Sequence, residues 1–396
     1  MTDYLSEAKA LFPYTQAMRR DLHAHPELGF REFRTAGIVA KELEGLGLEV
    51  TKGVGKTGVV ALMDGARPGP TILLRFDMDA LPIQEETGAA YASESPGVMH
   101  ACGHDGHTAI GLTAARLLLN HRAEFTGTLK FCFQPSEESF NGEECGGNQM
   151  MIREGILDNP HVDQTLALHL WNEKPLGWLC VAGGPVMASS DLFTVRLTGR
   201  GGHGASPHLT IDPVVAAAQI IGALQTITSR NVDPLATAVV SVTTVHAGTG
   251  FNVIPQDAEF TGTIRAFEPK VGSQILERFN EIVTTVGDAM GCQVEVDVRR
   301  FAPATINDAG MAAKVQDTAR ALLPDMELQT TGYLTMGAED MAFMQERAPG
   351  CYFFVGSNNK EQHLDYGHHH PKFDFDEEAL PHAAALMAAA AADLLR

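Results

Sequence analysis

Thiol, imidazole and carboxylate side chains gather in one short segment of the sequence, residues 100–107, which reads HACGHDGH. Zinc, manganese, cobalt and nickel accept these donor groups, and the two glycines leave the backbone free to turn several of them toward one ion. The same segment also suits a helix N-terminus that Asp105 caps, with its histidines in solvent. Taken alone, it leaves a metal site and a helix start as alternatives.

Two adjacent glutamates, Glu137 and Glu138, follow a strand-like run that ends at Phe133. Adjacent carboxylates point in different directions, so one can bind a metal while the other faces the reacting water. This arrangement suits metal-assisted hydrolysis, in which the ion lowers the pKa of water and a free carboxylate carries the proton. An exposed acidic loop is the alternative for such a pair.

Further donor groups lie later in the chain. His169 ends an apolar strand-like run, where a hydrogen-bonded core histidine is the more common case. The triplet at 368–370 stands between Gly367 and Pro371, which favours a rigid loop that carries a ligand. Since each donor falls at a strand end or in a Gly/Pro loop, the whole set predicts a centre for two divalent ions, about 3.5 to 4 Å apart. A thiolate together with imidazoles favours zinc, nickel or cobalt over magnesium. Manganese is a further candidate, and the sequence does not identify the metal.

Two aspartates, Asp77 and Asp79, end another strand-like run on the same side of an extended backbone. One of them can hydrogen-bond a ligand imidazole and so orient it, and a strand-terminal turn before Pro82 is the alternative. His203 lies in a glycine-rich loop that can fit closely against another surface.

Asn252 and Arg265 are candidate donors for a substrate carboxylate. A turn residue and a surface strand charge are the alternative interpretations of these two residues.

Hydrophobic patterns predict the elements that position these residues. Apolar runs at 58–63, 71–77 and 128–133 predict strands, and the run at 108–119 predicts a buried helix. Apolar strands that alternate with helices indicate an α/β layer with a mostly parallel sheet, covered on both faces. Motifs directly after such strands collect at the carboxyl edge of the sheet, where open α/β folds bind ligands.

The pattern changes near Met187. Strand, helix, strand, strand, helix and strand follow in that order, which is the split ferredoxin-like arrangement. The α/β character then resumes, and a chain of 396 residues is long enough for two domains. We therefore expect a discontinuous catalytic domain, residues 1–186 and 300–396, interrupted by an inserted domain, residues 187–299.

Composition excludes several classes of partner. The chain has 29 Lys plus Arg against 49 Asp plus Glu, a net charge of −20, which argues against nucleic acid and anionic membrane surfaces. The first dozen residues lack a secretory signal, and no stretch approaches the roughly 20 apolar residues that span a bilayer. The six cysteines have no framework spacing, so we expect mostly free thiols and a cytoplasmic location.

The chain resembles the M20 metallopeptidases, specifically the branch of hippurate hydrolase, auxin-conjugate hydrolases and related N-acyl-amino-acid amidohydrolases. The motifs that carry the resemblance run almost end to end and in this order: RDLHAHPEL, DMDALPI, HACGHDGH, FQPSEE, GRGGHGASPH, GTGFNVIP, MGAEDMAF and HHHPKFDFD. The resemblance implies a zinc-exopeptidase-like catalytic domain with an inserted ferredoxin-like lid that often mediates dimers. A homo-oligomer, dimer or tetramer, is therefore expected through the lid.

The resemblance also assigns roles to residues. It makes the metal ligands Cys102, His104, Glu138, His169 and His369, the last because the family places this ligand two residues before the proline. Glu137 becomes the general base, and His203 matches the lid histidine that stabilises the oxyanion, in its own or the partner subunit's site. Classical M20 peptidases have H-x-D where this chain has Asp77-Met78-Asp79, so the resemblance transfers no ligation to these aspartates.

These interpretations predict an enzyme that hydrolyses the amide of N-acyl-L-amino acids, hippurate-like or with other aromatic or aliphatic acyl groups, to a carboxylic acid and an amino acid. An N-acetyl-diamino-acid deacetylase and a short-peptide carboxypeptidase remain alternatives. A catalytically silent binding protein would have little reason to keep Glu137 beside a ligand. Because the net charge is negative, the substrate carboxylate must bind to local positive features.

Overall fold

The computed structural model describes residues 3–140 and 142–396, which form two units. The first unit comprises Met1–Val186, Ile306–Tyr333 and Asp340–Arg396, and the inserted unit comprises Met187–Thr305 and Leu334–Glu339. The inserted unit runs past the expected boundary at 299 because its last strand stays paired as far as Ala302, opposite Ser190.

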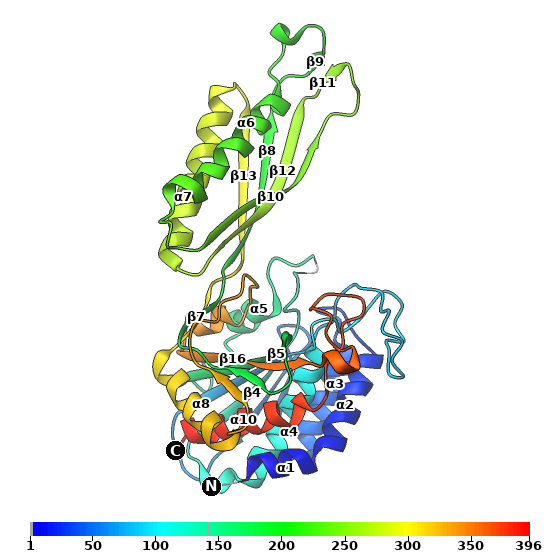
Figure 1. Cartoon of the computed structure of the whole chain (residues 1–396), viewed down its shortest axis with the longest axis vertical. Helices are drawn as coiled ribbons and strands as arrows, with labels where there is room; N and C mark the ends of the chain where they lie inside the picture. Colours follow the sequence, from blue (N-terminus) through cyan, green and yellow to red (C-terminus); the bar gives the residue numbers. More distant parts are fainter. Residues whose placement is uncertain (1–2, 141) are drawn as a thin grey trace. The chain divides into compact units, whose positions relative to one another are not determined.

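The first unit is built on an eight-stranded mixed sheet (Figure 1). The strand order is β1 (Glu49–Val54), β2 (Gly58–Asp64), β4 (Thr128–Gln134), β3 (Thr71–Asp77), β5 (Gln164–Pro175), β16 (Gly350–Asn358), β6 (Trp178–Cys180) and β15 (Glu327–Gln329). The central strands β4, β3, β5 and β16 are mutually parallel, and the sheet turns antiparallel at β1, β2 and between β16 and β6. The predicted α/β class with a mostly parallel sheet is confirmed.

The central strands of this sheet are mostly apolar, and every residue of β3 and β16 is buried beneath the helices that cover the sheet. The helices of the first unit are α1 (Tyr4–Ala10), α2 (Phe12–Ala24), α3 (Phe33–Gly45), α4 (His104–Asn120), α5 (Gly147–Arg153), α8 (Ala309–Leu322), α9 (Ala342–Gln345) and α10 (Ala379–Leu394). The alanine-rich α10 packs closely on α4, α1 and α8. Among the described residues, no helix is long and apolar enough to cross a membrane.

The inserted unit has the predicted strand and helix order. Its elements are β8 (Ser190–Thr198), α6 (Pro213–Thr226), β10 (Ala238–Ala247), β12 (Asp257–Ala266), α7 (Pro269–Ala289) and β13 (Gln293–Ala302). The strands form one antiparallel sheet in the order β10-β12-β8-β13, which is the ferredoxin-like arrangement. Both helices bury their apolar faces on it, around Phe193, Phe260 and Phe279.

Two small ribbons complete the chain. In the inserted unit β9 (Gly202–His203) pairs with β11 (Val253–Ile254). The short strands β7 (Gly184–Met187) and β14 (Thr305–Asn307) pair where the chain leaves and re-enters the first unit.

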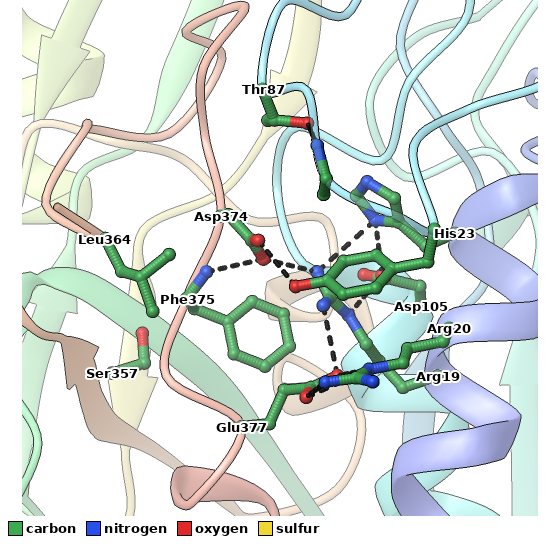
Figure 2. A network of polar contacts seen from close by, with 12 residues as sticks. Arg19, Arg20, His23, Thr87, Asp105, Ser357, Leu364, Asp374, Phe375 and Glu377 are labelled. Atoms are coloured by element: carbon green, nitrogen blue, oxygen red, sulfur yellow. Dashed lines mark hydrogen bonds and ion pairs between the residues drawn. The ribbon is translucent and has the colours of Figure 1, made fainter. Parts of the chain in front are cut away.

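A buried polar network fixes the start of α4 to α2 (Figure 2). Arg19 has no solvent exposure, and its guanidinium donates to Asp105 at 2.8 Å, to Asp374 at 2.8 Å and to Glu377 at 3.3 Å. Asp105 also bonds Nδ1 of His23, at 2.7 Å. Asp105, the residue after His104, is therefore held by side chains of α2, which in turn bind carboxylates of the C-terminal segment.

His23 predicts a specific dependence of stability on pH. Burial and the Arg19 charge lower its pKa, but Asp105 and Glu85 outweigh them and raise it to about 9. Because the folded-state pKa lies above the usual 6.5, the stabilisation is fully present below about pH 6.5 and is lost as the pH rises through 9. We expect His23→Gln to cost about 3 kcal/mol more at about pH 6 than at about pH 9.5, measured by denaturant unfolding. An equal cost at both pH values would show that His23 is neutral in the fold.

Candidate metal centre

The predicted donor residues of the first unit meet at the carboxyl edge of its sheet. β3 ends at Asp77, β4 ends at Gln134 shortly before Glu137, and α4 begins at His104. Gly103 precedes the helix with φ +88°, a left-handed backbone conformation that residues with side chains rarely adopt. The chain can therefore turn sharply between Cys102 and His104.

The ligand atoms of these residues lie within 4.8 Å of one another in overlapping groups of three. Three of these groups consist only of predicted ligands and the predicted base: Cys102/His104/His169, Cys102/Glu138/His369 and His104/Glu137/Glu138. The structure thus brings all five predicted ligands and the predicted base into one cluster, which we call the donor cluster. Cys102 belongs to two of these groups, so its thiolate can contribute a ligand atom to both of them.

Hydrogen bonds fix the tautomers of two histidines in the donor cluster. Nδ1 of His104 lies 3.0 Å from the carbonyl oxygen of Asp79, and Nδ1 of His169 lies 2.6 Å from that of Leu170. A carbonyl oxygen only accepts, so each Nδ1 carries a proton, and in the neutral imidazole Nε2 keeps the lone pair that a metal would bind. Nε2 of His169 lies 3.5 Å from Sγ of Cys102, so this lone pair is available to a metal.

Asp79 supports two predicted ligands at the same time. Its Oδ1 lies 3.2 Å from Nδ1 of His104, and its Oδ2 accepts from the backbone N–H of Glu138 at 3.0 Å. Asp79 therefore holds the imidazole of His104 and the backbone of Glu138 together; that it orients a metal ligand remains a prediction. Asp79 itself is fully buried.

Asp77 and His107 form a further group with His104, but their hydrogen bonds favour support over ligation. Nε2 of His107 accepts from the backbone N–H of Leu170 at 2.9 Å, so its Nδ1 donates to Asp77, at 2.6 Å. The other Asp77 oxygen accepts from Arg75 at 2.6 Å. Both nitrogens of His107 are therefore occupied.

His368 is a supporting residue that the sequence did not identify. Its Nε2 accepts from the backbone N–H of Asn172 at 3.1 Å, which leaves the proton on Nδ1, 3.9 Å from Sγ of Cys102. It can therefore donate to the thiolate. Its neighbour His369 has φ +65° and turns Nε2 to within 3.3 Å of Oε1 of Glu138.

Charge and burial in the donor cluster favour bound cations. Burial, with the charges of Glu138, Glu137 and Asp77, raises the pKa of the Cys102 thiol well above its ordinary value. Burial opposes protonation of His104, but Asp77 and Asp79 raise its pKa to about 10. Carboxylates therefore outnumber cationic groups around the Cys102 thiol, and a bound divalent ion would offset this excess of negative charge.

Glu138 gives a second sign that a cation fits. Its Oε1 is buried and accepts no hydrogen bond from any described residue, although Nε2 of His369 lies 3.3 Å away and Nε2 of His104 lies 3.9 Å away. A buried carboxylate oxygen without a donor is costly unless a cation binds it. Together with thiolate and imidazole, it is a donor set that suits transition metals.

His203 and Asn252 lie together in the ribbon of the inserted unit. His203 pairs with Val253, its Nδ1 accepts from Ala205 N–H at 3.0 Å, and Gly204 N–H donates to the Asn252 carbonyl at 2.8 Å. Both side chains are exposed.

Arg265 is on β12, outside this ribbon. Its Nε donates to Thr263 Oγ1 at 3.1 Å and its Nη1 donates to the Met336 carbonyl at 3.3 Å. The side chain is half-buried, and burial lowers its pKa.

The chain belongs to the peptidase family M20/M25/M40, whose family model matches residues 73–393. It is 38% identical over 365 residues to thermostable carboxypeptidase 1 of Saccharolobus solfataricus. The alignment covers 92% of this chain and 91% of that protein. It is 39% identical over 378 residues to N-acetylcysteine deacetylase of Bacillus subtilis, 94% of each chain.

Solved structures agree with this membership. The YxeP protein of Bacillus subtilis, described as a dinuclear metal-binding peptidase from the M20 family, superposes with a TM-score of 0.84. The two sequences are 36% identical, and the match covers 98% of this chain and 99% of that chain.

Proposed function

We propose that this protein is a metal-dependent amidohydrolase that cleaves the amide of N-acyl-L-amino acids and releases a carboxylic acid and a free amino acid. One observation carries the proposal: a buried carboxylate, Glu137, lies beside Glu138 in a cluster of soft and imidazole donors. Such a site can hold cations and still keep a carboxylate available for proton transfer.

Cys102, His104, Glu138, His169 and His369 are the proposed ligands of two divalent ions. When bound, such ions polarise a carbonyl oxygen and lower the pKa of water. Zinc, manganese, nickel and cobalt remain the candidates.

Glu137 is the proposed general base. Its carboxylate accepts a proton from the water that attacks the acyl carbon, and it then donates that proton to the leaving nitrogen as the C–N bond breaks. His203 as oxyanion donor, and Asn252 and Arg265 as donors for the substrate carboxylate, remain predictions from sequence. Assembly into a dimer or tetramer also remains a prediction.

The relatives support amide cleavage next to an amino acid. The two sequence relatives are a deacetylase of an N-acylated amino acid and a carboxypeptidase. Both reactions break an amide whose nitrogen belongs to an amino acid. A short-peptide carboxypeptidase is therefore the second candidate, and it differs from the first only in the acyl side of the substrate.

A panel of acyl groups on one amino acid separates these candidates. Metal-reconstituted protein would be given glycine with an N-acetyl, N-benzoyl, N-indoleacetyl or long-chain N-acyl group, and release of free amino acid would be measured. Glycyl-glycine represents the carboxypeptidase alternative, and N-acetyl-lysine represents the N-acetyl-diamino-acid deacetylase. We expect kcat/KM for at least one N-acyl glycine to exceed that for the dipeptide by at least about tenfold, about 1.4 kcal/mol. Faster cleavage of the dipeptide would favour the carboxypeptidase.

A further inference from the structure

Glu32 is a buried carboxylate that the proposed reaction does not use. It directly precedes α3, its side chain has 0% exposure, and no ion pair joins it to another described residue. Its Oε1 accepts from the backbone N–H of Ser136 at 2.9 Å, and its Oε2 accepts from the Thr57 hydroxyl at 2.5 Å. Burying a carboxylate without a cation is costly, so such a residue calls for a reason beyond packing.

Ser136 is the residue before Glu137, and its backbone is strained. Its φ is +47°, a left-handed conformation that is unfavourable for a non-glycine residue. The surroundings must therefore hold it, and the hydrogen bond from its N–H to Glu32 does so. Its hydroxyl also donates to the Ser139 carbonyl at 2.6 Å, which closes the turn from the other side.

The backbone amides on both sides of Glu137 are held by carboxylates. Glu32 accepts from the N–H of Ser136, and Asp79 accepts from the N–H of Glu138 at 3.0 Å. Burial and the charge of Asp79 raise the pKa of Glu32 to about 7, so the two carboxylates repel each other. The fold tolerates this repulsion at the turn that carries the proposed base and a proposed ligand.

We propose that Glu32 is a positioning residue for Glu137: by holding the Ser136 amide, it fixes the left-handed turn that directs the Glu137 carboxylate into the donor cluster. This inference rests on the proposed function, in which Glu137 moves the proton. Glu32 belongs to none of the groups of potential ligand atoms formed by the described residues, so it is not a proposed ligand.

Two substitutions at Glu32 separate the hydrogen bond from the charge. Glu32→Ala removes the acceptor of Ser136 N–H, whereas Glu32→Gln keeps a carbonyl oxygen for that N–H and offers an amide donor to Thr57. We expect Glu32→Ala to lower kcat by about 10- to 100-fold with KM within about twofold and bound metal unchanged, as for other residues that orient a functional group. Glu32→Gln should stay within about threefold of wild type.

Amide hydrogen exchange gives a readout that needs neither substrate nor metal. In the metal-free protein, exchange in a peptide that contains Ser136 should be at least about tenfold faster in Glu32→Ala and near wild type in Glu32→Gln. In a Glu137→Ala background, Glu32→Ala should lower kcat no further, because the group it positions is gone. Thr57→Val, which removes only the second anchor of Glu32, should change both readouts in the same direction by a smaller factor, and it decides the question if Glu32→Ala does not fold.

Several outcomes would overturn the inference: unchanged kcat and exchange in Glu32→Ala, a Gln variant as damaged as the Ala variant, loss of metal, or an undiminished effect in the Glu137→Ala background. Failure of the proposed function looks different. In that case wild-type protein with bound metal cleaves no amide, while the exchange comparison still reports whether Glu32 holds Ser136.

Discussion

Replacing Glu137 by alanine is expected to lower kcat by about 10³- to 10⁴-fold and to leave the bound ions in place. The proposed ligands lie elsewhere in the donor cluster, so the loss falls on proton transfer. The two quantities, kcat and ions per chain, are measured on the same preparation.

Glu144→Ala is the matched control for this prediction. Glu144 follows in the same loop, but its side chain is 81% exposed, so its removal should leave kcat within about twofold of wild type. A Glu137→Ala variant with near wild-type kcat would contradict the assignment of the base. Loss of metal in that variant would instead make Glu137 a ligand.

Replacing Cys102 by alanine is expected to reduce bound ions from two to at most one per chain and to lower turnover by at least about 10³-fold. Cys102 belongs to two of the groups of ligand atoms, so its loss removes a donor from both. A bound ion supplies several kcal/mol of stabilisation to the reaction, which corresponds to a loss of this size. Elemental analysis and turnover are measured together.

Cys132→Ala is the matched control, because it replaces a buried cysteine that is not a proposed ligand by the same residue. Cys132 is a buried thiol on β4 whose sulfur contacts Met151, and within residues 3–140 and 142–396 it belongs to no group of ligand atoms. This variant should keep both ions and lose only stability, by about 1 to 2 kcal/mol for the small cavity. Two ions retained in Cys102→Ala would exclude the thiolate as a ligand.

The sequence identified the donor residues because their types are unusual and their places follow from local pattern. Cys102 and His104 flank a glycine at a helix start, and Glu137 and Glu138 come soon after an apolar strand. The carboxyl ends of parallel strands share one edge of a sheet, so these residues were expected to meet. The fold class and the order of elements in the inserted unit could be predicted for the same reason, since both depend on hydrophobic periodicity.

Apart from Asp79, the supporting residues could not be predicted, because their roles depend on where side chains point after folding. His107 is three residues after His104, on the same face of α4, and only its bonds to Leu170 and Asp77 show that both nitrogens are occupied. Spacing alone does not distinguish such a histidine from a ligand. Glu32 is 104 residues from Ser136 in the chain, so no local pattern links them.

Titration of metal-free protein with a divalent ion, with turnover of an N-acyl amino acid and bound ions counted in the same samples, tests the central claim most directly. We expect no amide cleavage in the metal-free protein, and turnover that rises with bound metal and levels off near two ions per chain. Full turnover without metal, or two bound ions with no cleavage of any N-acyl amino acid in the panel, would contradict the account.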